Sequence, residues 1–172
     1  IKKKDILKIN VSWREGWKGI LNAHFWNKDE FSSDLGNLSQ GGGSIHEHSH
    51  GIHFLVCLSE ILNFKLSNEM INFKFFKKKN KEIFYDNYVN INWKNDDFII
   101  NYISDLISEP ADKFICIYTL KKKYELIFNY KKKCDFVKIT NLNSNLMKLK
   151  YFKKKRSTDF LNEIKHIMSI NN

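Results

Sequence analysis

FICIYTL (residues 114–120), YELIFNY (124–130), FVKIT (136–140) and MKLKYF (147–152) are four short apolar runs separated by polar segments. The last run alternates, with Met147 and Leu149 on one face and Lys148 and Lys150 on the other. A period of two is typical of a β-strand with one buried face. The four runs therefore predict an antiparallel meander whose inward side chains are Phe114, Cys116, Leu126, Phe128, Val137, Ile139, Met147 and Leu149.

The N-terminal half of the chain continues the same pattern. Strands are expected at 6–13, 19–26, 71–76 and 83–93, where apolar and polar residues alternate or β-branched residues cluster. Residues 52–62 form an apolar run that fits either a buried strand or a short helix. The polar segment 31–40 predicts at most one short helical turn.

Two helices are expected besides the strands. Asp96 and Asp97 are good helix caps, and Pro110 marks an end. The apolar stripe of this first helix, Asp96–Ser108, comprises Phe98, Ile99, Tyr102, Ile103, Leu106 and Ile107. A closing amphipathic helix is expected over Ser157–Ile170.

These elements predict an α+β fold in which one antiparallel, strand-rich domain spans residues 1–172 and carries two packed helices. A flexible loop around residues 39–50 is expected to interrupt it. Gly41-Gly42-Gly43-Ser44 stands in a chain with only 7 glycines, which indicates an engineered replacement for a longer loop or a junction of two fused polypeptides. We expect 41–50 to be poorly ordered, with nothing to bury and no function of its own.

The formal net charge of +10 comes almost entirely from lysine, since arginine occurs only at Arg14 and Arg156. The abundance of Lys, Asn, Ile and Phe is typical of a very AT-rich coding sequence, so the basic charge has two interpretations. One is a solvated surface shaped by codon usage; the other is an anionic partner. Scarce arginine argues against sequence-specific recognition of nucleic acid.

No familiar catalytic or cofactor motif is present in the sequence. It contains no G-x-S-x-G, no phosphate-binding loop and no glycine-rich dinucleotide pattern. His46, His48 and His50 would share one face of an extended chain and could hold zinc, but no fourth ligand is evident. The sequence therefore predicts no catalytic residue, no metal, no cofactor and no small-molecule substrate.

The three cysteines, Cys57, Cys116 and Cys134, lie far apart in apolar runs and form no CxxC pair. Buried thiols of this kind are typical of a reducing compartment. No apolar stretch reaches the length of a membrane span. We therefore expect an intracellular protein, either cytoplasmic or peripheral on a membrane face.

Two protein families share features with this chain. The strand 146–152, the basic turn and the helix 158–168 resemble the end of a pleckstrin-homology-like domain. The segment Ile91–Phe98 is similar to a strand of C2 domains, although the proline of that strand is missing. Both resemblances imply an antiparallel, strand-rich sheet, and the basic hairpin loops favour contact with phosphoinositides or other acidic lipids.

The lysine triplets lie at strand ends, where they could form a basic rim. Lysines near an anionic membrane contribute about 1 kcal/mol each, although lysine also protects exposed strand edges. We expect a non-enzymatic binding or scaffold module that contacts acidic lipids; the alternatives are a protein–protein adaptor and a non-specific RNA-binding subunit. The residues expected to contact lipid are Lys121, Lys122, Lys123, Lys131, Lys132, Lys133, Lys153, Lys154 and Lys155.

Overall fold

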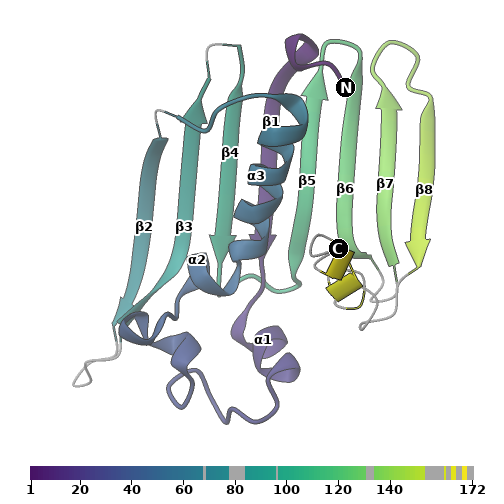
Figure 1. Cartoon of the computed structure of the whole chain (residues 1–172). Helices are drawn as coiled ribbons and strands as arrows, with labels where there is room; N and C mark the ends of the chain where they lie inside the picture. Colours follow the sequence, from purple (N-terminus) through teal and green to yellow (C-terminus); the bar gives the residue numbers. More distant parts are fainter. Residues whose placement is uncertain are drawn as a thin grey trace.

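The computed structural model describes residues 1–67, 69–77, 84–95, 97–130 and 134–153, together with 161, 164, 165, 168 and 169. Eight strands form one sheet in the order β2-β3-β4-β1-β5-β6-β7-β8 (Figure 1). The strands are β1 (Ile6–Arg14), β2 (Glu69–Lys77), β3 (Phe84–Lys94), β4 (Ile99–Asp105), β5 (Asp112–Thr119), β6 (Lys122–Tyr130), β7 (Cys134–Asn141) and β8 (Met147–Lys153).

The sheet is mixed, which corrects the expected antiparallel fold. β1 and β4 are parallel neighbours at its centre, whereas the other paired strands are antiparallel. The expected meander is confirmed as β5-β6-β7-β8. The fold class predicted for the whole chain, an antiparallel sheet of the pleckstrin-homology or C2 kind, is wrong because β4 joins the sheet beside β1.

The expected helix Asp96–Ser108 is the main local error, because most of this segment is β4. Ile100, Tyr102 and Ser104 point to one face and are fully buried, while Asn101 on the other face donates to the side chains of Asn90 and Asn92. A central strand with apolar residues on both faces lacks clean alternation. Its run of isoleucines therefore imitates the stripe of a helix.

The described α-helices are α1 (Trp17–Ala23), α2 (Ser44–Glu47) and α3 (Ser49–Leu62). Single 3-10 turns lie at Lys3–Asp5, Asp34–Gly36 and Leu38–Gln40. The strand expected at 19–26 is wrong, since α1 occupies much of it. The ambiguous run 52–62 is helical, within α3. The expected helix Ser157–Ile170 lies mostly outside the described residues.

Helix α3 packs on β1 in the middle of the sheet, and α2 contacts β3 and β4 (Figure 1). Leu55 is fully buried beneath α3. Gly51 brings the helix close to the sheet, because a Cβ there would lie 2.7 Å from Cε2 of Tyr102. The main core therefore joins α3 to β1, β3, β4 and β5, as Trp13, Ile91, Ile100 and Ile115 share it with Leu55.

The outer strand β8 is less buried than expected. Met147 is 59% exposed and Leu149 is 52% exposed, so their predicted inward position is wrong. Cys116 is buried, and the other five predicted core residues of the meander are partly buried. The inward face predicted for β5 is wrong, because Ile115 and Ile117 lie in the core and Phe114 and Cys116 therefore point to the opposite face. No helix of the described residues is long and apolar enough to cross a membrane.

Candidate functional site

A cavity of about 620 Å³ lies at the end of the sheet where β1 leaves the core. We call it the histidine cavity. It is framed by α1, by the segment that leads from α2 into α3, and by the start of β5. Its polar lining comprises Glu15, His24, His46, Glu47, His48, Ser49, His50 and Lys113.

The glycine-rich segment forms part of this cavity, which corrects the interpretation of 41–50 as a tract with nothing to bury. Gly42, Gly43 and Ser44 are buried, and α2 begins directly after Gly43. Gly41 has a positive φ of 85° and Gly43 one of 107°, and such angles favour glycine. The glycines are therefore required by the backbone; an engineered origin stays a prediction.

His48 is the buried histidine of the group, at 1% exposure. Its Nε2 lies 3.0 Å from the carbonyl oxygen of Asp105, so this nitrogen must donate the hydrogen bond. Burial lowers the pKa of His48 to about 4, with a further contribution from Lys113. The neutral ring thus ties the helix segment to β4, and Tyr102 strengthens that link by donating its hydroxyl hydrogen to the His48 carbonyl at 2.9 Å.

His46 and His50 are exposed and line the cavity. The zinc arrangement considered for His46, His48 and His50 requires an extended chain, whereas the segment is helical, so the three side chains do not share a face. Among the residues that the structure describes, no group of three His, Cys, Asp or Glu side chains converges on a possible metal position.

Glu47 has an unusual electrostatic environment. Burial raises its pKa above the ordinary value of a carboxyl group, and the negative charges of Glu15 and Asp34 act in the same direction. Charges on His24 and Lys113 oppose this rise. A partly buried carboxyl that faces imidazoles in a cavity is a good candidate for proton transfer.

His24 is held in one tautomer. Its Nδ1 lies 2.9 Å from the carbonyl oxygen of Ile20, which has no hydrogen to give, so Nδ1 donates. Nε2 is then left with a lone pair whenever the ring is neutral. The ring also packs edge-on against Trp26, with 5.2 Å between centroids, so its orientation is fixed from two sides.

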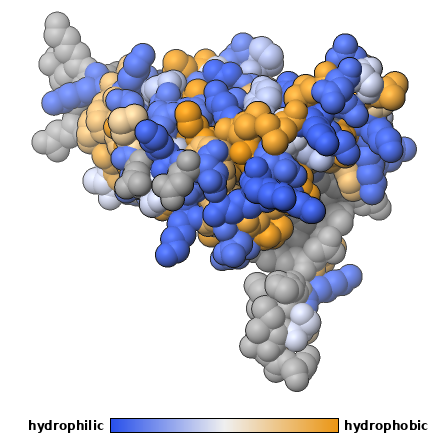
Figure 2. Space-filling view, turned by 90° about the horizontal axis from the view of Figure 1, so that it is seen from above, coloured by the Kyte–Doolittle hydropathy of each residue, from blue (hydrophilic) through white to orange (hydrophobic). Residues whose placement is uncertain are grey.

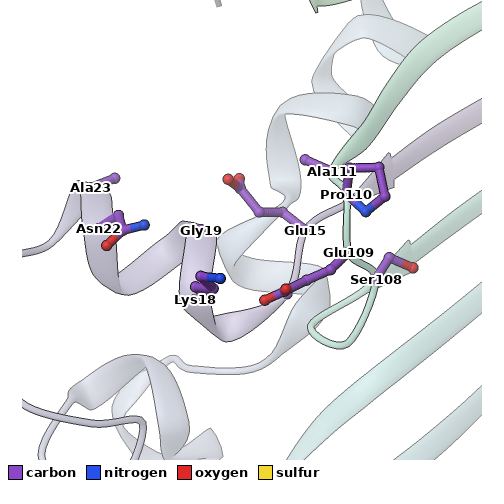
Figure 3. Close-up of a pocket in the computed structure, with 10 residues that line it drawn as sticks. Glu15, Lys18, Gly19, Asn22, Ala23, Ser108, Glu109, Pro110 and Ala111 are labelled. Carbon is purple, nitrogen blue, oxygen red and sulfur yellow. The ribbon is translucent and has the colours of Figure 1, made fainter.

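Glu15 and Lys113 form an ion pair in the wall of the cavity. A second cavity of about 600 Å³ shares Glu15 with the first and extends between α1 and the loop that joins β4 to β5. Figure 3 shows Lys18 and Asn22 on α1, across from Glu109 and Pro110 on that loop. The two cavities therefore form adjoining hollows at one end of the sheet.

The four described lysines among those predicted to bind lipid lie at two different ends of the sheet. Lys121, Lys122 and Lys123 lie at the β5–β6 turn, whereas Lys153 ends β8 at the opposite end of the sheet (Figure 1). Figure 2 views the end that carries the β5–β6 turn, where hydrophilic and apolar side chains are mixed. The remaining predicted residues, Lys131, Lys132, Lys133, Lys154 and Lys155, lie outside the described residues, and lipid contact by the triplets is not tested.

Sequence reasoning did not select Glu15, His24, Glu47 or Lys113. Glu15 and Lys113 are far apart in the sequence, so no local spacing connects them. One signal was available for Glu47, which lies among four histidines directly after the tightest glycine cluster of a glycine-poor chain; no such signal marks His24. Such a glycine cluster is typical of a backbone turn with positive φ angles as well as of a flexible linker.

No protein-family model matches the sequence, and no curated protein matches it. Solved structures do match in fold. An inositol dehydrogenase homolog from Azotobacter vinelandii in complex with NAD⁺ aligns with a TM-score of 0.62 at 12% identity, over 86% of this chain and 36% of that one. A levoglucosan dehydrogenase in complex with NADH and levoglucosan aligns with a TM-score of 0.59 at 8% identity, over 86% and 40%.

A UDP-N-acetylglucosamine 3-dehydrogenase from Acidithiobacillus ferrooxidans aligns with a TM-score of 0.55 at 10% identity, over 94% of this chain and 47% of that one. The chain thus spans less than half the length of each of these enzymes. At such identities the likeness shows the fold alone. The fold is that of part of dehydrogenase chains. The expected resemblance to pleckstrin-homology and C2 domains is therefore wrong. The fold also contradicts the expectation of a non-enzymatic, lipid-binding scaffold without a small-molecule substrate.

Proposed function

We propose that this chain is the substrate-binding part of an oxidoreductase and that the histidine cavity takes a small polyhydroxylated compound. The observation that carries the proposal is that His24, Glu47 and His50 all line one cavity within a dehydrogenase-like fold. A volume of about 620 Å³ lies in the ordinary range for small-molecule sites.

The cavity chemistry suits hydroxyl groups. Carboxylates accept hydrogen bonds from hydroxyl hydrogens, imidazoles donate or accept, and the Lys113 ammonium donates to hydroxyl oxygens. Oxidation of an alcohol to a carbonyl removes a hydride from carbon and a proton from oxygen. We assign the acceptance of that proton to His24 Nε2, because Nδ1 is engaged with the Ile20 carbonyl. Glu47 and His24 also interact through their charges.

The residues of this chain do not fit a dinucleotide cofactor. The sequence lacks a glycine-rich dinucleotide pattern, the described sheet has one parallel pair, and Glu15 and Glu47 would repel a pyrophosphate in the cavity. Two of the similar enzymes are described as complexes with NAD⁺ or NADH. We therefore propose that any such cofactor is bound by polypeptide other than these 172 residues.

The experiment is a titration of the isotope-labelled protein with myo-inositol and with levoglucosan, followed through the imidazole resonances of the histidines by NMR. We expect saturable shifts at His24 and His50 in the millimolar range. His24→Ala should weaken binding about tenfold, because a hydrogen bond is lost. His53→Ala, at an exposed position of α3 outside the cavity, is the matched control and should bind as the unmodified protein does.

Two results would contradict the proposal. One is the absence of saturable shifts with every cyclic polyol tested; the other is equal weakening by His24→Ala and His53→Ala. NAD⁺ added alone should leave the same resonances unmoved, and saturable binding of NAD⁺ would show that our assignment of the cofactor to another polypeptide is wrong.

An intracellular location is also proposed. Cys57, Cys116 and Cys134 form no disulfide, which suits a reducing compartment.

A further inference from the structure

A buried carboxylate lies directly beneath the glycine-rich segment. Asp86, the third residue of β3, is 1% exposed. Its Oδ2 accepts hydrogen bonds from the Ser44 hydroxyl at 2.6 Å and from the backbone N–H of Ile45 at 3.1 Å. A carboxylate is costly to bury unless its hydrogen bonds are made, so this one is held in place by the start of α2.

Gly43 and Asp86 are complementary in shape. A Cβ on Gly43 would lie 2.1 Å from Oδ1 of Asp86, far inside van der Waals contact. The carboxylate therefore occupies the space that any side chain at position 43 would need. Oδ1 has no hydrogen-bond partner among the described residues, so Oδ2 makes the contacts that hold the segment.

The anchored segment leads directly into the histidine cavity. Ser44 is fully buried, and Ser104 on β4 donates to its hydroxyl at 3.3 Å. His46 and Glu47 follow within the next three residues. Helix α2 has only four residues, too few to be stable without external contacts, so its position depends on what holds its first turn.

We propose that Asp86 is a positioning residue that sets the place of His46 and Glu47 in the cavity by anchoring Ser44 and Ile45. It touches no substrate and acts through the backbone of α2. The inference deepens the function proposed above and rests on it for its consequence in binding. The anchoring itself is tested separately, without any ligand.

The test compares Asp86→Ala, Asp86→Asn and Ser44→Ala with Asp112→Ala as the matched control. Asp112 also accepts from a serine hydroxyl, that of Ser12 at 2.9 Å. It faces away from the cavity, because its neighbour Lys113 lines it. The control therefore removes a hydrogen-bonded carboxylate, which is also ion-paired with Arg14, from the other face of the sheet.

The first readout is amide hydrogen exchange. The N–H groups of Glu47 and His48 bond to the carbonyls of Gly43 and Ser44 at 3.0 Å and report directly on α2. Asp86→Ala should speed their exchange at least about tenfold, and Ser44→Ala by a smaller factor, because two hydrogen bonds and one are lost. Asp86→Asn keeps an acceptor oxygen and should change exchange by less than about threefold; Asp112→Ala should leave it unchanged.

The second readout is affinity for myo-inositol, which should fall about tenfold in Asp86→Ala and recover in Asp86→Asn. Unchanged exchange of α2 in both Asp86→Ala and Ser44→Ala would overturn the proposal. Exchange that rises equally in α2 and in the central strands would also overturn it, since that is general destabilisation. If the unmodified protein binds no polyol, the proposed function fails while the exchange result still decides whether Asp86 anchors α2.

Discussion

Acidification should destabilise this fold through His48, and the size of the effect follows from its environment. Burial lowers the pKa of His48 from 6.5 to about 4. In the unfolded chain the imidazole takes up a proton below about pH 6.5, whereas in the folded protein it stays neutral until about pH 4. The unfolded state is therefore favoured increasingly as the pH falls through this window.

The magnitude is set by the gap between the two pKa values. At about 1.4 kcal/mol for each pH unit, a fall from 6.5 to about 4 corresponds to about 3 kcal/mol of lost unfolding free energy. That is a large fraction of the stability of an ordinary domain. The effect is present in full near pH 4 and absent above about pH 7.

The assay is urea denaturation between pH 7.5 and pH 4.5 for the unmodified protein and for His48→Gln. Glutamine can still donate to the Asp105 carbonyl but does not titrate. Glu47 acts with the opposite sign, since burial raises its pKa and its protonation favours the folded state as the pH falls. Glu47 is present in both proteins, so it cancels in their difference.

Between pH 7.5 and pH 4.5, the unfolding free energy of the unmodified protein should fall relative to that of His48→Gln. We expect this relative fall to reach most of the about 3 kcal/mol given above. His53→Gln, at an exposed position, should follow the pH dependence of the unmodified protein. Parallel curves for the unmodified protein and His48→Gln would refute the reasoning, because they would mean that His48 titrates alike in the folded and unfolded states.

Two further predictions test the packing. Leu55→Ala should lower the free energy of unfolding by about 2–5 kcal/mol, because Leu55 is fully buried. Ile61→Ala on the same helix should lower it by less than about 0.5 kcal/mol, because Ile61 is 77% exposed. Equal losses in urea denaturation would show that α3 packs on the sheet through another face. Trp26 is 66% exposed while Trp13 and Trp93 are below 10%, so Trp26→Phe should remove most of the tryptophan emission that acrylamide quenches, and unchanged quenching would mean that Trp26 is covered.

Local pattern was enough to find the strands with one solvated face. The runs that became β5, β6 and β7 were recognised because strand geometry places alternate side chains on opposite faces, and each of these strands lies in an antiparallel meander that needs only short turns. The same reasoning found β3, where Val89, Ile91 and Trp93 face the core. These elements follow from neighbours in the chain.

Local pattern failed where apolar residues lie on both faces of a strand. Residues 99–105 carry Ile100 and Tyr102 on the face that packs into the core and Ile99 and Ile103 on the other face, and a stretch of that kind also fits the stripe of a helix. α1 was mistaken for a strand for a related reason, since a seven-residue helix shows barely two turns of periodicity. The meaning of such segments depends on what packs against them.

The sequence by itself determined the meander, the supply of apolar side chains and the absence of a dinucleotide motif. Only the tertiary structure decided that β1 and β4 are parallel, that Gly43 lies against Asp86, and that Glu15 meets Lys113 from the far side of the chain. The physical reason is that each of these contacts joins residues more than 40 positions apart. Their energy comes from burial and hydrogen bonds that exist only after the chain has folded, so no local spacing records them.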